Sequence, residues 1–240
     1  MIVAEQKPID EIIESLKGFK KVVIASCGTC VTVCMTGGEK EALVLRGMLE
    51  AAAGENGEDL NVSIVNLKRQ CDDEFIDDLE EELLNGDVIL SMACGVGVQF
   101  LAGKYADKIV LPALNTKFYG AAKELGYWTE LCAGCGSCLL EKTGGICPIA
   151  RCSKSILNGP CGGSQNAKCE VDSNIECAWQ LIYDKLAALG RLDRLSEIYE
   201  PRDWRTSRDG GPRSLRKDDV SLDNAEEDPG LAGPGAGAAQ

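Results

Sequence analysis

The sequence predicts an α/β fold, a flavodoxin-like parallel sheet followed by a cysteine-rich segment and a helix. Two observations support this prediction. Short runs rich in β-branched residues alternate with helix-like segments through residues 1–131. From residue 132 onward, apolar periodicity gives way to closely spaced cysteines and glycines. We therefore expect an α/β domain over 1–131, a cysteine-rich domain with a helix over 132–205, and a disordered tail over 206–240.

The expected strands are short and nearly continuously apolar, as is typical of parallel strands buried on both faces. They cover residues 22–26, 62–66, 88–92 and 108–112, with a fifth at 127–131. The expected helices show apolar residues at three-to-four spacing and cover 9–16, 39–53, 73–84, 98–106, 116–125 and 175–189. Strand–helix alternation at this spacing favours a parallel sheet.

Composition excludes several classes of function. The net charge of −13 disfavours nucleic-acid and membrane partners, because both need clustered cations. The chain has no histidine, so a catalytic histidine base and a Cys/His zinc finger are excluded, and we predict no catalytic residue. We see neither a signal-peptide core nor an 18-residue apolar run. We expect a cytoplasmic protein whose 13 cysteines bind metal, because thiols stay reduced there.

The first cysteine set follows three predicted strands. Cys27, Cys30 and Cys34 follow the first strand, Cys71 the second and Cys94 the third. The carboxyl ends of parallel strands share one edge of the sheet, where ligands bind. The three closely spaced thiols with Cys94 would make a four-thiolate site, and Cys71 competes for the fourth position.

The second set, Cys132, Cys135 and Cys138 in CAGCGSC, is followed by Cys147 and a proline. A CxxCxxC run with a later Cys-Pro is typical of ferredoxin-type [4Fe–4S] binding, because a tight turn places successive thiolates on adjacent irons. The last gap is longer here than in bacterial ferredoxins.

A third set comprises Cys152, Cys161, Cys169 and Cys177, in a glycine-rich stretch that has no apolar core. Such a segment needs a cross-link, and metal coordination supplies one. The arithmetic 13 = 3 × 4 + 1 allows three four-thiolate sites. We expect two or three [4Fe–4S] clusters, with zinc possible at one site, and the partition of ligands stays open.

Two other functions fit parts of this pattern. Structural Cys₄ zinc sites would make the chain an interaction module that braces an enzyme complex. A dithiol at Cys27 and Cys30 would make it a thiol–disulfide enzyme, although Cys34 and Cys94 favour metal binding.

Longer motifs resemble a known family. CAGCGSC, TGGICPIARCSKSILNGPCGG, KCEVD, ECAWQLIYDKL and PRDW resemble the methylenetetrahydrofolate reductase C-terminal domain family, the iron–sulfur small subunit of the acetogen-type enzyme. ASCGTCVTVCMTGGEKE is also similar, so the resemblance covers about residues 20–205.

The resemblance implies a non-catalytic iron–sulfur subunit of an oxidoreductase in one-carbon metabolism. Its partners would be a flavin-containing catalytic subunit, which reduces methylene- to methyltetrahydrofolate, and ferredoxin or another reduced donor. Carried over by position, the ligands form three sets: Cys27, Cys30, Cys34 and Cys94; Cys132, Cys135, Cys138 and Cys147; and Cys152, Cys161, Cys169 and Cys177.

Overall fold

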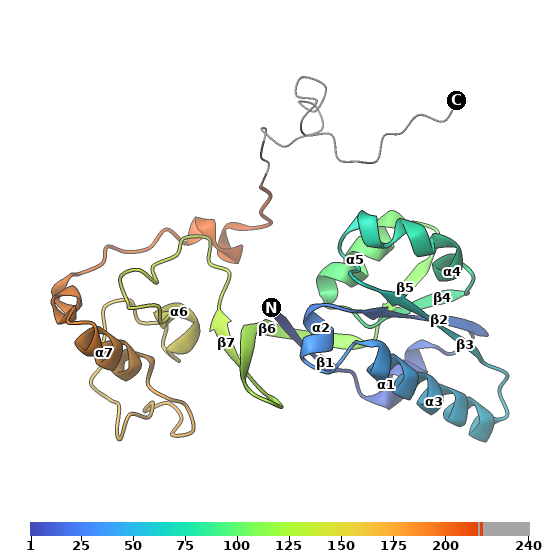
Figure 1. Cartoon of the computed structure of the whole chain (residues 1–240), viewed down its shortest axis with the longest axis horizontal. Coiled ribbons are helices and arrows are strands. Elements are labelled where there is room, and N and C mark those ends of the chain that lie inside the picture. Colours follow the sequence, from blue (N-terminus) through green and yellow to red (C-terminus); the bar gives the residue numbers. More distant parts are fainter. Residues whose placement is uncertain (216, 218–240) are drawn as a thin grey trace. The chain divides into compact units, whose positions relative to one another are not determined.

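A four-stranded parallel sheet organises the amino-terminal part of the protein. The computed structural model describes residues 1–215 and 217. The sheet contains β2 (Lys21–Cys27), β3 (Asn61–Leu67), β4 (Val88–Ser91) and β5 (Ile109–Pro112), in the order β3-β2-β4-β5. Every neighbouring pair is parallel (Figure 1). The predicted α/β class is confirmed, and the order matches the first four strands of a flavodoxin-like sheet.

Helices cover both faces of this sheet (Figure 1). The side chains of β2 show how, because they point alternately to one face and the other. Ile24 packs in one apolar cluster with Leu45 of α3 (Glu39–Asn56), while Val23 packs in a second with Leu101 of α5 (Gly95–Lys104). Successive side chains of a strand point to opposite faces, so β2 needs apolar residues throughout. Helix α1 (Ile9–Ser15) joins the first cluster and α4 (Glu80–Leu84) the second.

The helix predicted over 116–125 is wrong. These residues belong to β6 (Leu114–Glu124), the middle strand of an antiparallel sheet of order β1-β6-β7. Strands β1 (Ile2–Gln6) and β7 (Tyr127–Cys132) pair with β6 on either side. The strand expected at 127–131 is therefore present but antiparallel, outside the parallel sheet. Pairing on both edges overrides the helix propensity of the alanine, lysine and glutamate residues in this segment.

The helix predicted over 73–84 is interrupted. Two 3₁₀ turns, Asp73–Phe75 and Asp77–Leu79, precede α4. Carboxylates at positions four apart repel one another along a continuous helix, and the buried Ile76 and Leu83 hold the segment against the sheet.

The cysteine-rich region contains little regular structure. It has a one-turn helix, α6 (Pro148–Arg151), and α7 (Ala178–Ala188), which confirms the helix expected at 175–189. Trp179, Ile182 and Leu186 of α7 form a small apolar cluster with Ile146 and Leu195, near the 3₁₀ turn Leu192–Ser196. None of the described helices is both long and apolar enough to cross a membrane.

The chain divides into two compact units. One comprises Met1–Ala133 with Leu139–Tyr199, and the other comprises Gly134–Cys138 with the chain from Glu200 onward. The second unit includes the 3₁₀ turns Trp204–Thr206 and Arg208–Gly210. The disordered tail predicted over 206–240 thus overlaps ordered turns at its start. Residue 216 and residues 218–240 of that tail lie outside the described structure.

Gly120 allows β6 and β7 to approach closely, which yields a prediction. A Cβ added there would lie 2.0 Å from the Thr129 carbonyl oxygen. We expect Gly120→Ala to lower the free energy of unfolding by about 2 kcal/mol, because backbone must move to admit the methyl group. Chemical denaturation measures this change.

The matched control is Gly47→Ala, on the exposed side of α3, where an added Cβ meets nothing within 4 Å. It should raise stability by about 0.5–1 kcal/mol, as expected for glycine inside a helix. Equal effects of the two substitutions would contradict this account of the β6–β7 contact.

Candidate functional site

Three cysteines gather at the carboxyl edge of the parallel sheet. Cys27 is the last residue of β2, Cys71 follows β3, and Cys94 directly precedes α5 after β4. Cys27 and Cys94 are buried in one apolar cluster. The side chain of Cys71 is exposed, yet desolvation by the neighbouring atoms raises the pKa of its thiol, and the nearby Cys94 and Cys27 thiols raise it further. The structure therefore brings both competitors for the fourth position, Cys71 and Cys94, near Cys27.

The other two cysteines of this set lie on α2 (Cys30–Val33) and directly after it. Cys30 is partly exposed, whereas Cys34 is buried in the same apolar cluster as Cys27. The Cys34 Sγ lies 3.6 Å from the Val31 carbonyl oxygen and 3.3 Å from the Thr36 hydroxyl. Cys34 thus has hydrogen-bond partners within the chain that a metal would have to displace.

A buried amide that the sequence analysis missed holds this edge together. Gln70 is 0% exposed, and its Nε2 donates to the carbonyl oxygens of Ala25 (2.8 Å) and Ser26 (2.9 Å) on β2. The Ser91 hydroxyl of β4 donates to the Gln70 Oε1 at 2.6 Å. Gln70 immediately precedes Cys71, so one side chain ties the ends of β2 and β4 to the segment that carries a candidate ligand. The only sequence signal is its position beside a cysteine.

The third cysteine set lines one small cavity. Four thiols that lie far apart in the sequence border it, together with Trp179 and Glu170: Cys152, Cys161, Cys169 and Cys177. Backbone hydrogen bonds fix two of them, because the Cys169 amide donates to Ile175 (2.9 Å) and the Cys177 amide to Ala167 (2.8 Å). The loops that carry these thiols thus converge without a large apolar core.

The polar groups around this cavity act on individual thiols. The Ser153 hydroxyl, 3.5 Å from the Cys169 Sγ, lowers the pKa of that thiol, and backbone amides lower it further. The Cys161 thiol lies 3.5 Å from a Glu170 carboxylate oxygen, which is also paired with Lys154. The contacts around Cys169 favour its thiolate form, which is the form that metals bind.

The CAGCGSC set is distributed between the two units. Cys132 ends β7 and Cys147 precedes α6, where its Sγ accepts a hydrogen bond from the Ala150 amide at 3.5 Å. Cys135 and Cys138 belong to the second unit. The Cys135 Sγ lies 3.0 Å from the Nη2 of Arg202, so a cation already contacts this sulfur.

Within residues 1–215 and 217, no three cysteine or carboxylate side chains form a group that could hold a metal ion. The thiols that border the small cavity nevertheless have the donor chemistry and the common location that a four-thiolate centre requires.

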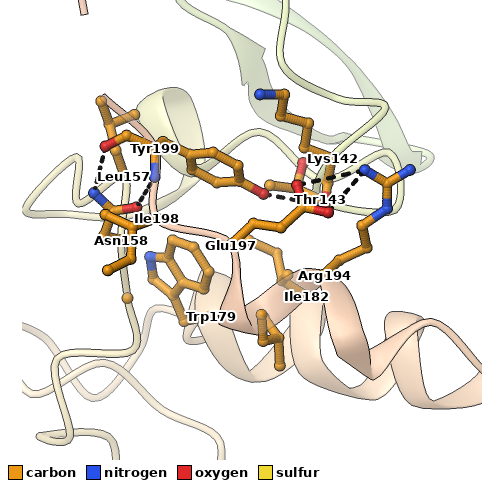
Figure 2. Close-up of a pocket in the computed structure, with 12 residues that line it drawn as sticks. Lys142, Thr143, Leu157, Asn158, Trp179, Ile182, Arg194, Glu197, Ile198 and Tyr199 are labelled. Carbon is orange, nitrogen blue, oxygen red and sulfur yellow. Dashed lines mark hydrogen bonds and ion pairs between the residues drawn. The ribbon is translucent and has the colours of Figure 1, made fainter. Parts of the chain in front are cut away.

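Trp179 also lines a larger cavity, of about 250 Å³ (Figure 2). Its polar groups already pair with one another. The Asn158 amide exchanges two hydrogen bonds with the Tyr199 backbone (2.9 and 2.7 Å), and Arg194 binds Glu197 at 3.1 Å. We interpret this cavity as the place where the segment up to Tyr199 packs on α7, because the Asn158, Arg194 and Glu197 side chains already pair within the chain.

Residues 111–205 match the family model described as methylene-tetrahydrofolate reductase C terminal. These residues are similar to that family, so the resemblance derived from the sequence is confirmed over 111–205. This region includes β6, β7, both carboxy-terminal cysteine sets and the PRDW motif. No curated protein and no solved structure matches the chain.

The Gln70 network predicts a large loss of stability on truncation. Gln70→Ala would remove two hydrogen bonds to the β2 carbonyls and leave the buried Ser91 hydroxyl without the acceptor for its proton. We expect the free energy of unfolding to fall by about 3 kcal/mol, measured by denaturant titration.

Gln99→Ala serves as the control, because its amide donates only to Gly95 on the exposed side of α5. Its effect should stay within about 0.5 kcal/mol. A loss in Gln70→Ala no larger than in this control would contradict a structural role for the buried amide.

Proposed function

We propose that this protein is an iron–sulfur electron-transfer subunit that delivers electrons to the flavin of a methylenetetrahydrofolate reductase catalytic subunit. The observation that carries the proposal is the convergence of Cys152, Cys161, Cys169 and Cys177 on one cavity, inside a region that matches the reductase C-terminal family. Four converging thiols in a segment with a small apolar core favour a metal centre over four unrelated buried cysteines.

The ligand sets proposed from the sequence remain three. The sheet edge offers Cys27, Cys30, Cys34, Cys71 and Cys94; the second set is Cys132, Cys135, Cys138 and Cys147; the third is the cavity quartet. A [4Fe–4S] cluster held by such thiolates supplies one-electron transfer when bound.

The surrounding residues would favour binding at the quartet in two ways. The Ser153 hydroxyl and nearby amides stabilise the Cys169 thiolate, which binds metal more readily than the thiol. Trp179 is 5% exposed, and its indole donates to the Ile156 carbonyl at 3.0 Å, so a fixed apolar ring closes one side of the cavity. Limited solvent access influences the potential of a centre held there.

The composition supports an electron carrier that works with a separate catalytic subunit. The chain has no histidine, the commonest general acid or base. Conversion of methylene- to methyltetrahydrofolate takes two electrons and two protons, so a one-electron carrier must act twice per turnover while the partner's flavin collects the electrons. Ferredoxin or another low-potential protein is the donor that this role requires.

Analysis of iron, zinc and acid-labile sulfide on anaerobically purified protein tests the proposal. We expect about eight or more iron atoms per chain with matching sulfide, as two or three four-iron clusters require. Zinc without sulfide would contradict electron transfer and support the structural Cys₄ zinc module.

A cysteine variant tests the quartet itself. Cys169→Ser should lose about four iron atoms, because one cluster loses a ligand, while the far-ultraviolet circular dichroism of the α/β part is retained. Ser153→Ala is the matched partner: it keeps all four thiols but removes the hydroxyl beside Cys169. As purified, this variant should contain the native amount of iron. In the presence of a chelator, it should release that iron faster than the native protein. Full iron content in Cys169→Ser would refute this ligand assignment.

A further inference from the structure

The side chain of Arg202 binds the CAGCGSC loop at three acceptors. Its Nη2 lies 3.2 Å from the Cys135 carbonyl oxygen and 3.0 Å from the Cys135 Sγ, and it also donates to the Ser137 carbonyl oxygen. All these residues belong to the same compact unit. Arg202 comes from the PRDW motif, so this motif has a physical contact with a predicted metal-binding loop.

Residues that follow Arg202 make additional contacts with Arg202 itself and with the CAGCGSC loop. The Trp204 ring lies 5.4 Å from the Arg202 guanidinium carbon, close enough for a cation–π interaction. The Thr206 hydroxyl donates to the Cys135 carbonyl at 3.0 Å. Gly136 has φ +83°, and a Cβ there would lie 2.1 Å from the Thr206 carbonyl oxygen. The loop therefore fits closely against the segment that follows PRDW.

A buried donor of Arg202 is left without a partner in the part of the chain that the structure describes. Its Nε is buried and has no hydrogen-bond partner among the described residues. A buried charged N–H without an acceptor is costly, so this group favours an additional acceptor beside Cys135. The inorganic sulfide of a bound cluster is an acceptor of the required chemistry.

A cationic donor on a ligand sulfur has a defined effect on redox properties. Charge-assisted hydrogen bonds are stronger than neutral ones, and they stabilise the form in which the acceptor carries more negative charge. Reduction of a cluster adds negative charge to its sulfurs. Hydrogen bonds to those sulfurs therefore raise the reduction potential.

We propose that Arg202 is a positioning residue that holds the CAGCGSC loop in place and, through its bond to the Cys135 sulfur, raises the reduction potential of the cluster bound there. This inference rests on the proposed function, because it assigns a cluster to Cys135. It adds a residue that sets the potential at which that cluster accepts an electron.

The test compares two charge-removing substitutions in the same segment. Arg202→Gln removes the guanidinium from the sulfur, whereas Arg205→Gln removes a cation whose side chain is 88% exposed and pairs with Asp203. Cys135→Ser identifies which cluster signal to follow. Redox titration followed by electron paramagnetic resonance should show that signal at lower potential in Arg202→Gln and close to the native potential in Arg205→Gln. An unchanged potential in Arg202→Gln overturns the inference.

A third variant distinguishes two effects, the positioning of the CAGCGSC loop and the hydrogen bond from Arg202 to the Cys135 sulfur. Thr206→Val removes one hydrogen bond to the Cys135 carbonyl and leaves the Arg202–sulfur contact. It should release iron to a chelator faster than the native protein while keeping the native potential. If Arg202→Gln does not retain its iron, Arg202→Met replaces it, because it removes the charge and the donors while keeping a long side chain. Its potential should fall in the same direction, and a native potential there counts against the proposal.

Failure of the proposed function is distinguishable from failure of this inference. If the native protein contains zinc without sulfide, electron transfer is refuted, and the loop contact is tested by chelator-driven zinc release. Faster release in Arg202→Gln than in Arg205→Gln would support the positioning role, and equal rates would overturn it.

Discussion

The carboxyl edge of the parallel sheet depends on the buried amide of Gln70. Strand β2 has buried carbonyl groups at Ala25 and Ser26 near its end, and the loops after β2, β3 and β4 carry cysteines. Gln70 donates to both of these carbonyls and accepts from Ser91, so β2, β4 and the segment before Cys71 become one rigid support. The positions of Cys27, Cys71 and Cys94 near one another follow from this support.

The cysteine sets differ in what holds them in place. At the sheet edge, an apolar core with several layers of packed residues fixes the backbone before any ligand binds, and Cys27 and Cys94 belong to that core. Around α7 the apolar cluster is small, and turns and single backbone hydrogen bonds bring the quartet together. Such a segment gains more from cross-linking than the sheet does, which agrees with the density of cysteines in it.

The Arg202 contact gives the PRDW motif a place in the structure. A motif without cysteine would pass for a surface segment, yet it reaches both the backbone and the sulfur of Cys135. Residues that hydrogen-bond to ligands orient those ligands and tune the metal centre. A ligand set read from cysteines alone therefore describes only part of a thiolate site.

The sequence by itself determined the parallel strands, most of the helices and the gathering of cysteines at the sheet edge. These features follow from local periodicity and from the rule that parallel strands end at one edge. Only the tertiary structure decided that residues 116–125 form a strand, because pairing with β1 and β7 outweighs local propensity. The same holds for Gln70 and Arg202, whose roles come from acceptors that are distant in sequence, 44 to 67 positions away, and that no local pattern encodes.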